Sequence, residues 1–399
     1  MSLPPKNAGE MGGMNHPAAN SPHRLYHRIG WIAVLLALVV IVFGAFVRLS
    51  NAGLSCPDWP TCYGRVTWPV HDHEIAHAND AFDRPVESHK AWREQVHRHL
   101  AATLGLMVFA LAFLGSRKVR GGKALVIGAS LLVAMGIPLY MRGHHAAAAS
   151  LAIAGEVLLL GWALRPDGWL SPRGDFSRLS AALLAVIVFQ ALLGMWTVTW
   201  LLKPVVVMGH LLGGLTTLSL LTWLACRASP LAALHCAPAW KLRGAIVLGI
   251  GLVAIQIALG GWVSANYAAL ACGTDFPTCL NQWLPQTNFR EAFVLWRGIG
   301  ADYEGGVLDG PARVAIQLSH RGFAVIVAGA LIWLGLKIRR IPEISGWGTA
   351  ILTFLGVQVL LGILNVKTGL PLKIAVSHNA VAALLLFTLV LLLARLRKA

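Results

Sequence analysis

The stretch QALLGMWTVTWLLKPVVVMGH, residues 190–210, has a counterpart in QVLLGILNVKTGLPLKIAVSH, residues 358–378. In both copies a Gln precedes the final His by 20 residues and a Gly precedes it by 16. Each copy joins the end of one apolar run to the start of the next. We therefore interpret each copy as parts of two consecutive transmembrane helices, with a His near the start of the second.

Two further features recur in the same order along the chain. The segment RLSNAGLSCPDWPTC (48–62) resembles SANYAALACGTDFPTC (264–279), and each follows an apolar run. The dipeptides His97-Arg98 and His320-Arg321 then each open a later run. An ordered set of three matches indicates that a four-helix unit has been duplicated.

The two copies of this unit differ by an insertion. His97 and His210 are 113 residues apart, whereas His320 and His378 are 58 residues apart. The excess of 55 residues matches two extra helices with their loops. We expect an inserted hairpin at about 118–172, which leaves the downstream topology unchanged because it adds an even number of spans.

The composition indicates a membrane protein. Of the 399 residues, 56% are hydrophobic and only 13% are charged. A helix of about 20 apolar residues crosses the hydrocarbon core, where backbone polar groups must be satisfied within the helix. The expected fold class is an all-α polytopic membrane protein. Its ten expected spans are 29–48, 98–115, 123–141, 146–164, 179–202, 205–226, 243–263, 313–337, 346–366 and 374–394.

The distribution of basic residues predicts the orientation. The net charge is +16, and Lys and Arg concentrate in alternate loops and at both ends of the chain. This pattern places both termini in the cytoplasm and the long segments 49–96 and 264–312 outside. The lipid bilayer is therefore the expected partner, and nucleic acid is not.

The chain is expected to divide into three parts. Residues 1–27 are polar and rich in Gly, Pro, His and Asn, which is typical of a disordered tail. They are too polar for a signal peptide, so the first helix should stay as an uncleaved anchor. An N-terminal bundle at 28–227, which includes the hairpin, and a C-terminal bundle at 240–396 should follow.

Four histidines lie at matching depth in the duplicated frame, near the outer ends of spans. A polar side chain in the membrane is costly without a partner, and imidazole is an axial ligand of haem iron. Two helices per half, each with one His, suit a porphyrin held inside a four-helix bundle. Zinc or iron–sulfur binding would need thiolates or more ligands. The predicted ligands are His97 and His210 in one half and His320 and His378 in the other, with His99 as a rival for His97.

The two halves differ beside the first His of each pair. Glu94 precedes His97 by three residues and Gln317 precedes His320 by three, so each shares a helical face with its His. A carboxylate can accept a proton or stabilise a developing cation, whereas an amide can do neither. We predict that Glu94 is catalytic and that the second half holds a permanent cofactor. The alternative is an interfacial acid beside neighbouring arginines.

Arg98 and Arg321 follow the first His of each pair near the membrane surface. A guanidinium at this position can form bidentate hydrogen bonds with a haem propionate. It can equally be a snorkelling anchor at the interface. Both interpretations stay open for both residues.

Four cysteines lie at matched positions in the two outer loops. A pair in each loop on an oxidising face predicts two disulfides, within Cys56 and Cys62 and within Cys272 and Cys279. Metal binding is disfavoured because no further ligands converge nearby. Whether the disulfides are staples or also exchange electrons stays open.

The chain resembles the haem A synthase family in five motifs, over nearly all of its length except the tail and residues 118–172. They are GLSCPDWPTC, Glu94-x-x-His97-Arg98, the stretch ending in His210, His320-Arg321, and His378. The resemblance implies two pseudo-symmetric four-helix bundles. It also implies haem b between His320 and His378, and substrate haem O at His97 and His210.

The implied activity is oxidation of the C8 methyl group of haem O to a formyl group, which yields the haem A of cytochrome c oxidase. Successive hydroxylations and loss of water from a gem-diol would give the formyl group, with oxygen from water and electrons passed to an acceptor. Glu94 matches the catalytic acid of the family. The implied location is the bacterial inner membrane, with the haem sites toward the periplasm. Haem O synthase and the electron acceptor are candidate partners, and a homo-oligomer is also considered.

Two other functions are considered. A di-haem b-type electron-transfer protein would hold two permanent haems of equal standing and would not need Glu94. A transporter would also contain internal repeats, but it usually places broken helices at the membrane midplane. Here the polar groups cluster near the outer ends of the spans.

Overall fold

The computed structural model describes residues 22–165, 176–228 and 233–398. Within these ranges ten helices are long and apolar enough to cross a membrane, so the all-α polytopic fold is confirmed. They are α1 (Pro22–Leu49), α3 (Ser88–Gly115), α4 (Gly122–Met141), α5 (His145–Ala163), α6 (Ser177–Thr199), α7 (Pro204–Arg227), α9 (Arg243–Ala265), α11 (Gly310–Arg339), α12 (Ser345–Lys367) and α13 (Leu372–Arg395).

The remaining elements are short and lie between the spans. The helices are α2 (Asp72–Ala81), α8 (Ala237–Lys241) and α10 (Phe289–Ala292), with 3-10 turns at Ser116–Lys118 and Pro342–Ile344. In the described part of the chain the sheet is limited to two residues in each of β1 (Leu234–His235) and β2 (Leu396–Arg397), paired in parallel.

Eight of the spans form two rings of four helices. In the first ring α1 contacts α3, α3 contacts α6, α6 contacts α7, and α7 contacts α1. In the second ring α9, α11, α12 and α13 contact one another in the corresponding order. Each ring therefore places α3 opposite α7, or α11 opposite α13. The two rings meet through α1 and α7 on one side and α9 and α13 on the other.

The repeat extends to the backbone conformation of the loops. Left-handed residues occur at matching positions, such as Asn51 (φ 50°) with Tyr267 (φ 53°), and Leu202 (φ 59°) with Leu370 (φ 63°). Leu201 is left-handed where the second copy has Gly369, which adopts this conformation without strain. The same turns therefore close both rings, although the residues in them differ.

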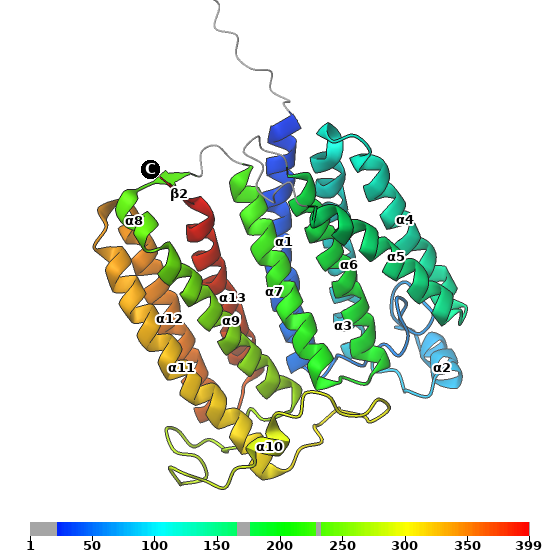
Figure 1. Cartoon of the computed structure of the whole chain (residues 1–399). Coiled ribbons are helices and arrows are strands. Elements are labelled where there is room, and N and C mark those ends of the chain that lie inside the picture. The colour runs from blue at the N-terminus through cyan, green and yellow to red at the C-terminus, as the bar shows by residue number, and fades with distance from the viewer. Residues whose placement is uncertain (1–21, 166–175, 229–232, 399) are drawn as a thin grey trace, which may run out of the picture.

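The inserted hairpin consists of α4 and α5, as predicted, and lies at the edge of the first ring (Figure 1). It packs mainly through α5 onto α6, and α3 still contacts α6 directly. The two hairpin helices approach closely at Gly155, where an added Cβ would lie 2.8 Å from the carbonyl oxygen of Ala129. Such contacts between small residues hold helices together in lipid, where apolar burial does not.

Three helices begin three or more residues before the apolar spans that the sequence predicts. α1 begins at Pro22, so residues 22–27, expected in the tail, are helical, and residues 1–21 lie outside the described part. Tyr26 anchors this start, since its hydroxyl lies 2.7 Å from Oγ of Ser180 and its ring stacks on Phe176. α3 and α11 begin at Ser88 and Gly310, because a polar extension outside the hydrocarbon continues the helix.

The long loops gather at one end of the bundle, and the described chain ends lie at the other (Figure 1). We call the first the disulfide end, defined by residues 50–87 and 266–309. Here the two halves are tied together, because Arg48 donates a hydrogen bond of 2.6 Å to the carbonyl oxygen of Ser264. Arg84 and Glu304 form an ion pair of 2.8 Å between the two loops. The disulfide end is thus one connected layer over both rings.

Candidate functional site

The four histidines lie on opposite corners of the two rings. His97 is on α3 and His210 on α7, and His320 is on α11 and His378 on α13. In each half, the two helices that carry the pair lie opposite each other in the ring of four. All four side chains are partly buried. The fold therefore brings together, in each half, the two histidines that the sequence nominated.

Each of these imidazoles lies against a glycine of a neighbouring helix. A Cβ added at any of the four glycines would crowd Cε1 of the ring, so only glycine leaves the ring in this position. The distances from the added Cβ to Cε1 are 2.8 Å for Gly44 and His97, 3.3 Å for Gly194 and His210, 3.1 Å for Gly260 and His320, and 3.1 Å for Gly362 and His378. We call these four residues the seat glycines.

Gly44→Ala should displace His97, because the new methyl group would lie closer to the ring than van der Waals contact allows. Overpacking of this kind typically costs about 1–3 kcal/mol, so haem binding at the first pair should weaken about tenfold. Titration of purified protein with haem, in a His320→Ala background, measures this. Gly105→Ala is the control, since an added Cβ there meets no atom within 4 Å. Equal haem affinity of the two variants would contradict the role of Gly44 in positioning His97.

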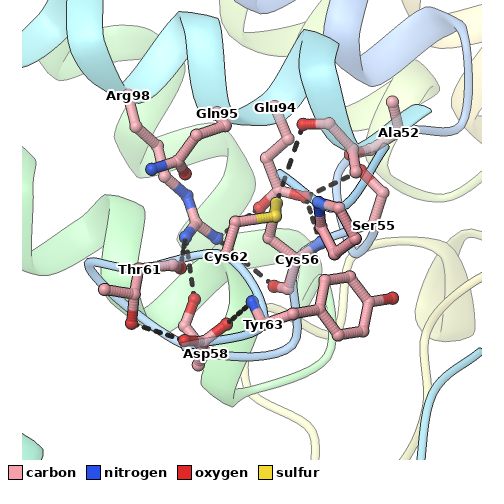
Figure 2. Close-up of a disulfide and its surroundings, with 12 residues drawn as sticks. Ala52, Ser55, Cys56, Asp58, Thr61, Cys62, Tyr63, Glu94, Gln95 and Arg98 are labelled. Atoms are coloured by element: carbon pink, nitrogen blue, oxygen red, sulfur yellow. Dashed lines mark hydrogen bonds and ion pairs between the residues drawn. A yellow bond between two sulfur atoms is a disulfide. The ribbon is translucent and has the colours of Figure 1, made fainter. Parts of the chain in front are cut away.

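Glu94 points from α3 onto the first disulfide loop (Figure 2). Its carboxylate is buried and accepts hydrogen bonds from Oγ of Ser55 (3.0 Å) and the backbone N–H of Cys56 (2.9 Å). The other oxygen pairs with Arg98 at 2.5 Å. In the second half Gln317 is equally buried, and its Oε1 has no hydrogen-bond partner in the described part of the chain. The two halves therefore differ in the charge of this side chain and in its hydrogen bonding.

Arg98 and Arg321 differ in the partners they have. Arg98 donates to the carbonyl oxygens of Asp58 (2.7 Å) and Thr61 (2.6 Å) as well as pairing with Glu94 (Figure 2). It therefore clamps the loop, a role that neither of the two interpretations from the sequence described. Arg321 donates to the carbonyl oxygen of Thr278 at 3.1 Å, while its Nε and Nη2 are buried with no partner among the described residues. Those two nitrogens suit a carboxylate ligand.

Disulfides form in both loops, Cys56 with Cys62 and Cys272 with Cys279, as the sequence predicts. Both are buried. In each loop the second cysteine pairs with a residue three positions later, Arg65 or Gln282, in an isolated bridge. The loops thus share one local structure.

The inserted hairpin touches the first disulfide loop. The ring of Tyr140, at the end of α4, lies 6.1 Å from that of Trp59 and 5.1 Å from that of His145. Within the loop, burial raises the pKa of Tyr63 to about 12, and its hydroxyl donates to the carbonyl oxygen of Pro85. The first disulfide loop is therefore contacted by the hairpin as well as by Glu94 and Arg98.

The second disulfide-end loop also covers part of the first ring. The backbone N–H of Tyr303 donates to the carbonyl oxygen of Leu201 at 3.1 Å. Nζ of Lys203 lies 3.4 Å from the centre of the Trp296 ring and has no hydrogen-bond partner within the described ranges. Burial lowers the pKa of Lys203. The sequence repeat did not reveal this residue, since its counterpart is Pro371.

His99, the alternative to His97, is exposed on α3, whereas His97 is partly buried. Cys226 and Cys236 are free and buried. Sequence reasoning missed Gly44, Gly260 and the amide of Gln256. In the sequence, the only sign of a seat glycine was the equivalent position of Gly194 and Gly362 in the repeated stretch. That stretch does not include α1 or α9.

The donor set around each His pair fits haem. Nδ1 of His97, His210 and His378 is buried and has no hydrogen-bond partner in the described structure. Within the same ranges, no cluster of three or more His, Cys, Asp or Glu side chains could hold a metal ion. Two imidazoles suit an ion that brings its own equatorial ligands, as porphyrin iron does.

Known proteins resemble the chain along nearly its whole length. It matches the family described as cytochrome oxidase assembly protein over residues 27–138 and 140–390. A heme A synthase of Shewanella oneidensis is 38% identical over 367 residues, which cover 90% of this chain and 93% of the relative. Heme A synthases of Paracoccus denitrificans and Sphingopyxis alaskensis are 26% and 25% identical, over 97% and 89% of this chain and 91% and 87% of their own. The similarity extends over both helix rings.

Proposed function

The chain belongs to the haem A synthase family of cytochrome oxidase assembly proteins, and from this premise we propose that it is a membrane enzyme that makes haem A. In this proposal it is an oxidoreductase that converts the C8 methyl group of haem O to a formyl group. The observation that carries the proposal is the repeated pair of opposed histidines, with a carboxylate beside one pair and an amide beside the other. A di-haem electron-transfer protein would not need a carboxylate beside only one of its two haems.

The first ring is proposed to hold the substrate. His97 and His210 would bind haem O from opposite helices of this ring. Each imidazole would be held in position by its seat glycine. Glu94, one turn from His97 on the same helical face, would stabilise positive charge that develops on the substrate or accept a proton. The hydrogen bonds from Ser55 and Cys56 and the pairing with Arg98 hold the carboxylate in place. The N-terminal bundle, residues 28–227, is thus the proposed reaction half.

The second ring, within residues 240–396, is proposed to hold haem b between His320 and His378. When bound there, haem b would supply a redox centre that carries electrons from the substrate to an acceptor. Two buried nitrogens of Arg321 have no hydrogen-bond partner among the described residues, which supports a contact with a propionate. Gln317 offers no acid beside this pair, which suits a cofactor that is not itself transformed.

The disulfide end is proposed to face the periplasm of a bacterial inner membrane. Lys and Arg concentrate toward the opposite end, in keeping with the positive-inside rule. The two disulfides support an oxidising compartment. Haem O synthase and an electron acceptor are the proposed partners.

The test is direct detection of the product. Cells that supply haem O should accumulate formyl haem when they express the wild-type chain, measured by extraction of pigments and mass spectrometry. A His97→Ala, His210→Ala double variant is the control and should yield none. Two tightly held b haems with no formyl haem in the wild type would favour the electron-transfer alternative and reject the proposal.

A further inference from the structure

A glutamine lies four residues before three of the four seat glycines. These are Gln190 before Gly194, Gln256 before Gly260 and Gln358 before Gly362, while Val40 stands before Gly44. Residues four apart lie one above the other on a helix face. The glutamines therefore face the same space as the histidines, and His97 alone has an apolar residue at this position.

In the second ring both amides touch their histidines. Nε2 of Gln256 lies 3.1 Å from Nδ1 of His320 and also donates to the carbonyl oxygen of His320. Nε2 of Gln358 lies 3.2 Å from Nε2 of His378. Oε1 of both glutamines is buried without a hydrogen-bond partner among the described residues. Rotation of an amide exchanges its donor and acceptor, so each side chain can follow the protonation of its imidazole.

Among the described residues, neither imidazole of the first ring has a hydrogen bond to a glutamine amide. The amide of Gln190 lies across Gly213, one turn beyond His210, where an added Cβ would fall 1.7 Å from Nε2. The second copy has Val381 in place of Gly213, and a Val side chain leaves no room for an amide across the helix there. Its glutamine is turned toward the His instead. Beside His97, the Val40 side chain has no hydrogen-bonding group at all.

We propose that Gln256 and Gln358 are positioning residues that make the second His pair a retaining site, and that Val40 makes the first pair an exchanging site. An outer hydrogen-bond partner fixes the orientation of a ligating imidazole and raises its basicity, and its loss typically costs about 10- to 100-fold in metal affinity. This inference rests on the proposed function, in which haem O must enter the first ring and haem A must leave it. The second ring has no such requirement.

The experiment exchanges the two residues between the rings. Gln256→Val is made in a His97→Ala background, where haem can be held only by the second pair. Val40→Gln is made in a His320→Ala background, where only the first pair can hold haem. Each purified protein is loaded with haem, and the rate of haem transfer to an excess of an apoglobin is followed by absorbance. The midpoint potential of each bound haem is recorded as well.

We expect Gln256→Val to release haem about tenfold faster than its parent and to raise the midpoint potential, since the imidazole becomes less basic. Val40→Gln should slow release by a similar factor. Gln256→Glu, which keeps the size and one acceptor oxygen, should restore slow release. Unchanged release in both exchanged variants would overturn the inference. So would a Gln256→Glu protein that loses haem as fast as Gln256→Val, because the role would then be packing only.

The outcomes separate this inference from the proposed function. A wild-type chain that binds no haem in haem-replete cells would reject both. A wild type that makes formyl haem, with release rates that do not respond to the exchange, would leave the function standing and overturn the assignment of Gln256, Gln358 and Val40.

Discussion

His378→Ala should lose the haem of the second pair during purification, and His320→Ala should do the same. The two residues lie on opposite helices of one ring, so either substitution leaves the iron with a single imidazole. The loss should exceed the about 10- to 100-fold that removal of an outer hydrogen-bond partner costs. The haem-to-protein ratio and the low-spin absorption spectrum of the purified variants measure it.

His99→Ala is the matched control for this loss. His99 is exposed on α3, and its removal leaves both pairs intact, so the haem content should equal that of the wild type. Bis-histidine spectra of undiminished intensity in both His320→Ala and His378→Ala would show that another pair of ligands holds the cofactor.

Glu94→Gln should lower the rate of formyl haem production by about 100-fold or more, the lower range of a positioned acid or base. The amide has almost the same shape, but it carries no charge. It has one acceptor oxygen, so its NH2 group would face either Ser55 and Cys56 or Arg98, all of which donate to the carboxylate. Single-turnover conversion of loaded haem O, followed by pigment extraction, measures the rate apart from substrate binding.

Ser55→Ala separates catalysis from bracing of the loop. It removes one hydrogen bond to Glu94 and keeps the carboxylate, the Cys56 N–H bond and the pairing with Arg98. If Glu94 acts chemically, Ser55→Ala should retain most of the rate, since the carboxylate is still present and is still held by Cys56 and Arg98. Equal losses in Ser55→Ala and Glu94→Gln would mean that the carboxylate serves the loop and not the reaction.

The spans were predictable because a transmembrane helix depends only on a run of consecutive apolar residues. Apolar length alone found all ten, and the unequal spacing of the histidines located α4 and α5 as the insertion. The starts of α1, α3 and α11 were not predictable, because hydropathy marks only the part of a helix that lies in hydrocarbon. Ser88 and Gly310 begin polar extensions that continue the backbone hydrogen bonding beyond it.

Only two of the four seat glycines could be recognised from sequence spacing. Gly194 and Gly362 lie 16 residues before their histidines, across a single turn, and appear in the repeat at once. Gly44 and Gly260 lie 53 and 60 residues from His97 and His320, across a long loop, so no local spacing links them. Their role depends on how closely α1 approaches α3 and α9 approaches α11.

By itself the sequence determined the number of spans, the duplication and the two disulfide pairs, and it predicted the four paired histidines, because each depends on residue type or short spacing. Only the tertiary structure decided what the charged and amide side chains touch. Arg98 and Glu94 are bound to the Cys56 loop, and Gln256 contacts His320. Two nitrogens of Arg321 have no partner in the part of the chain that the structure describes. Such contacts join side chains on separate helices or loops, and their distances follow from how the helices pack.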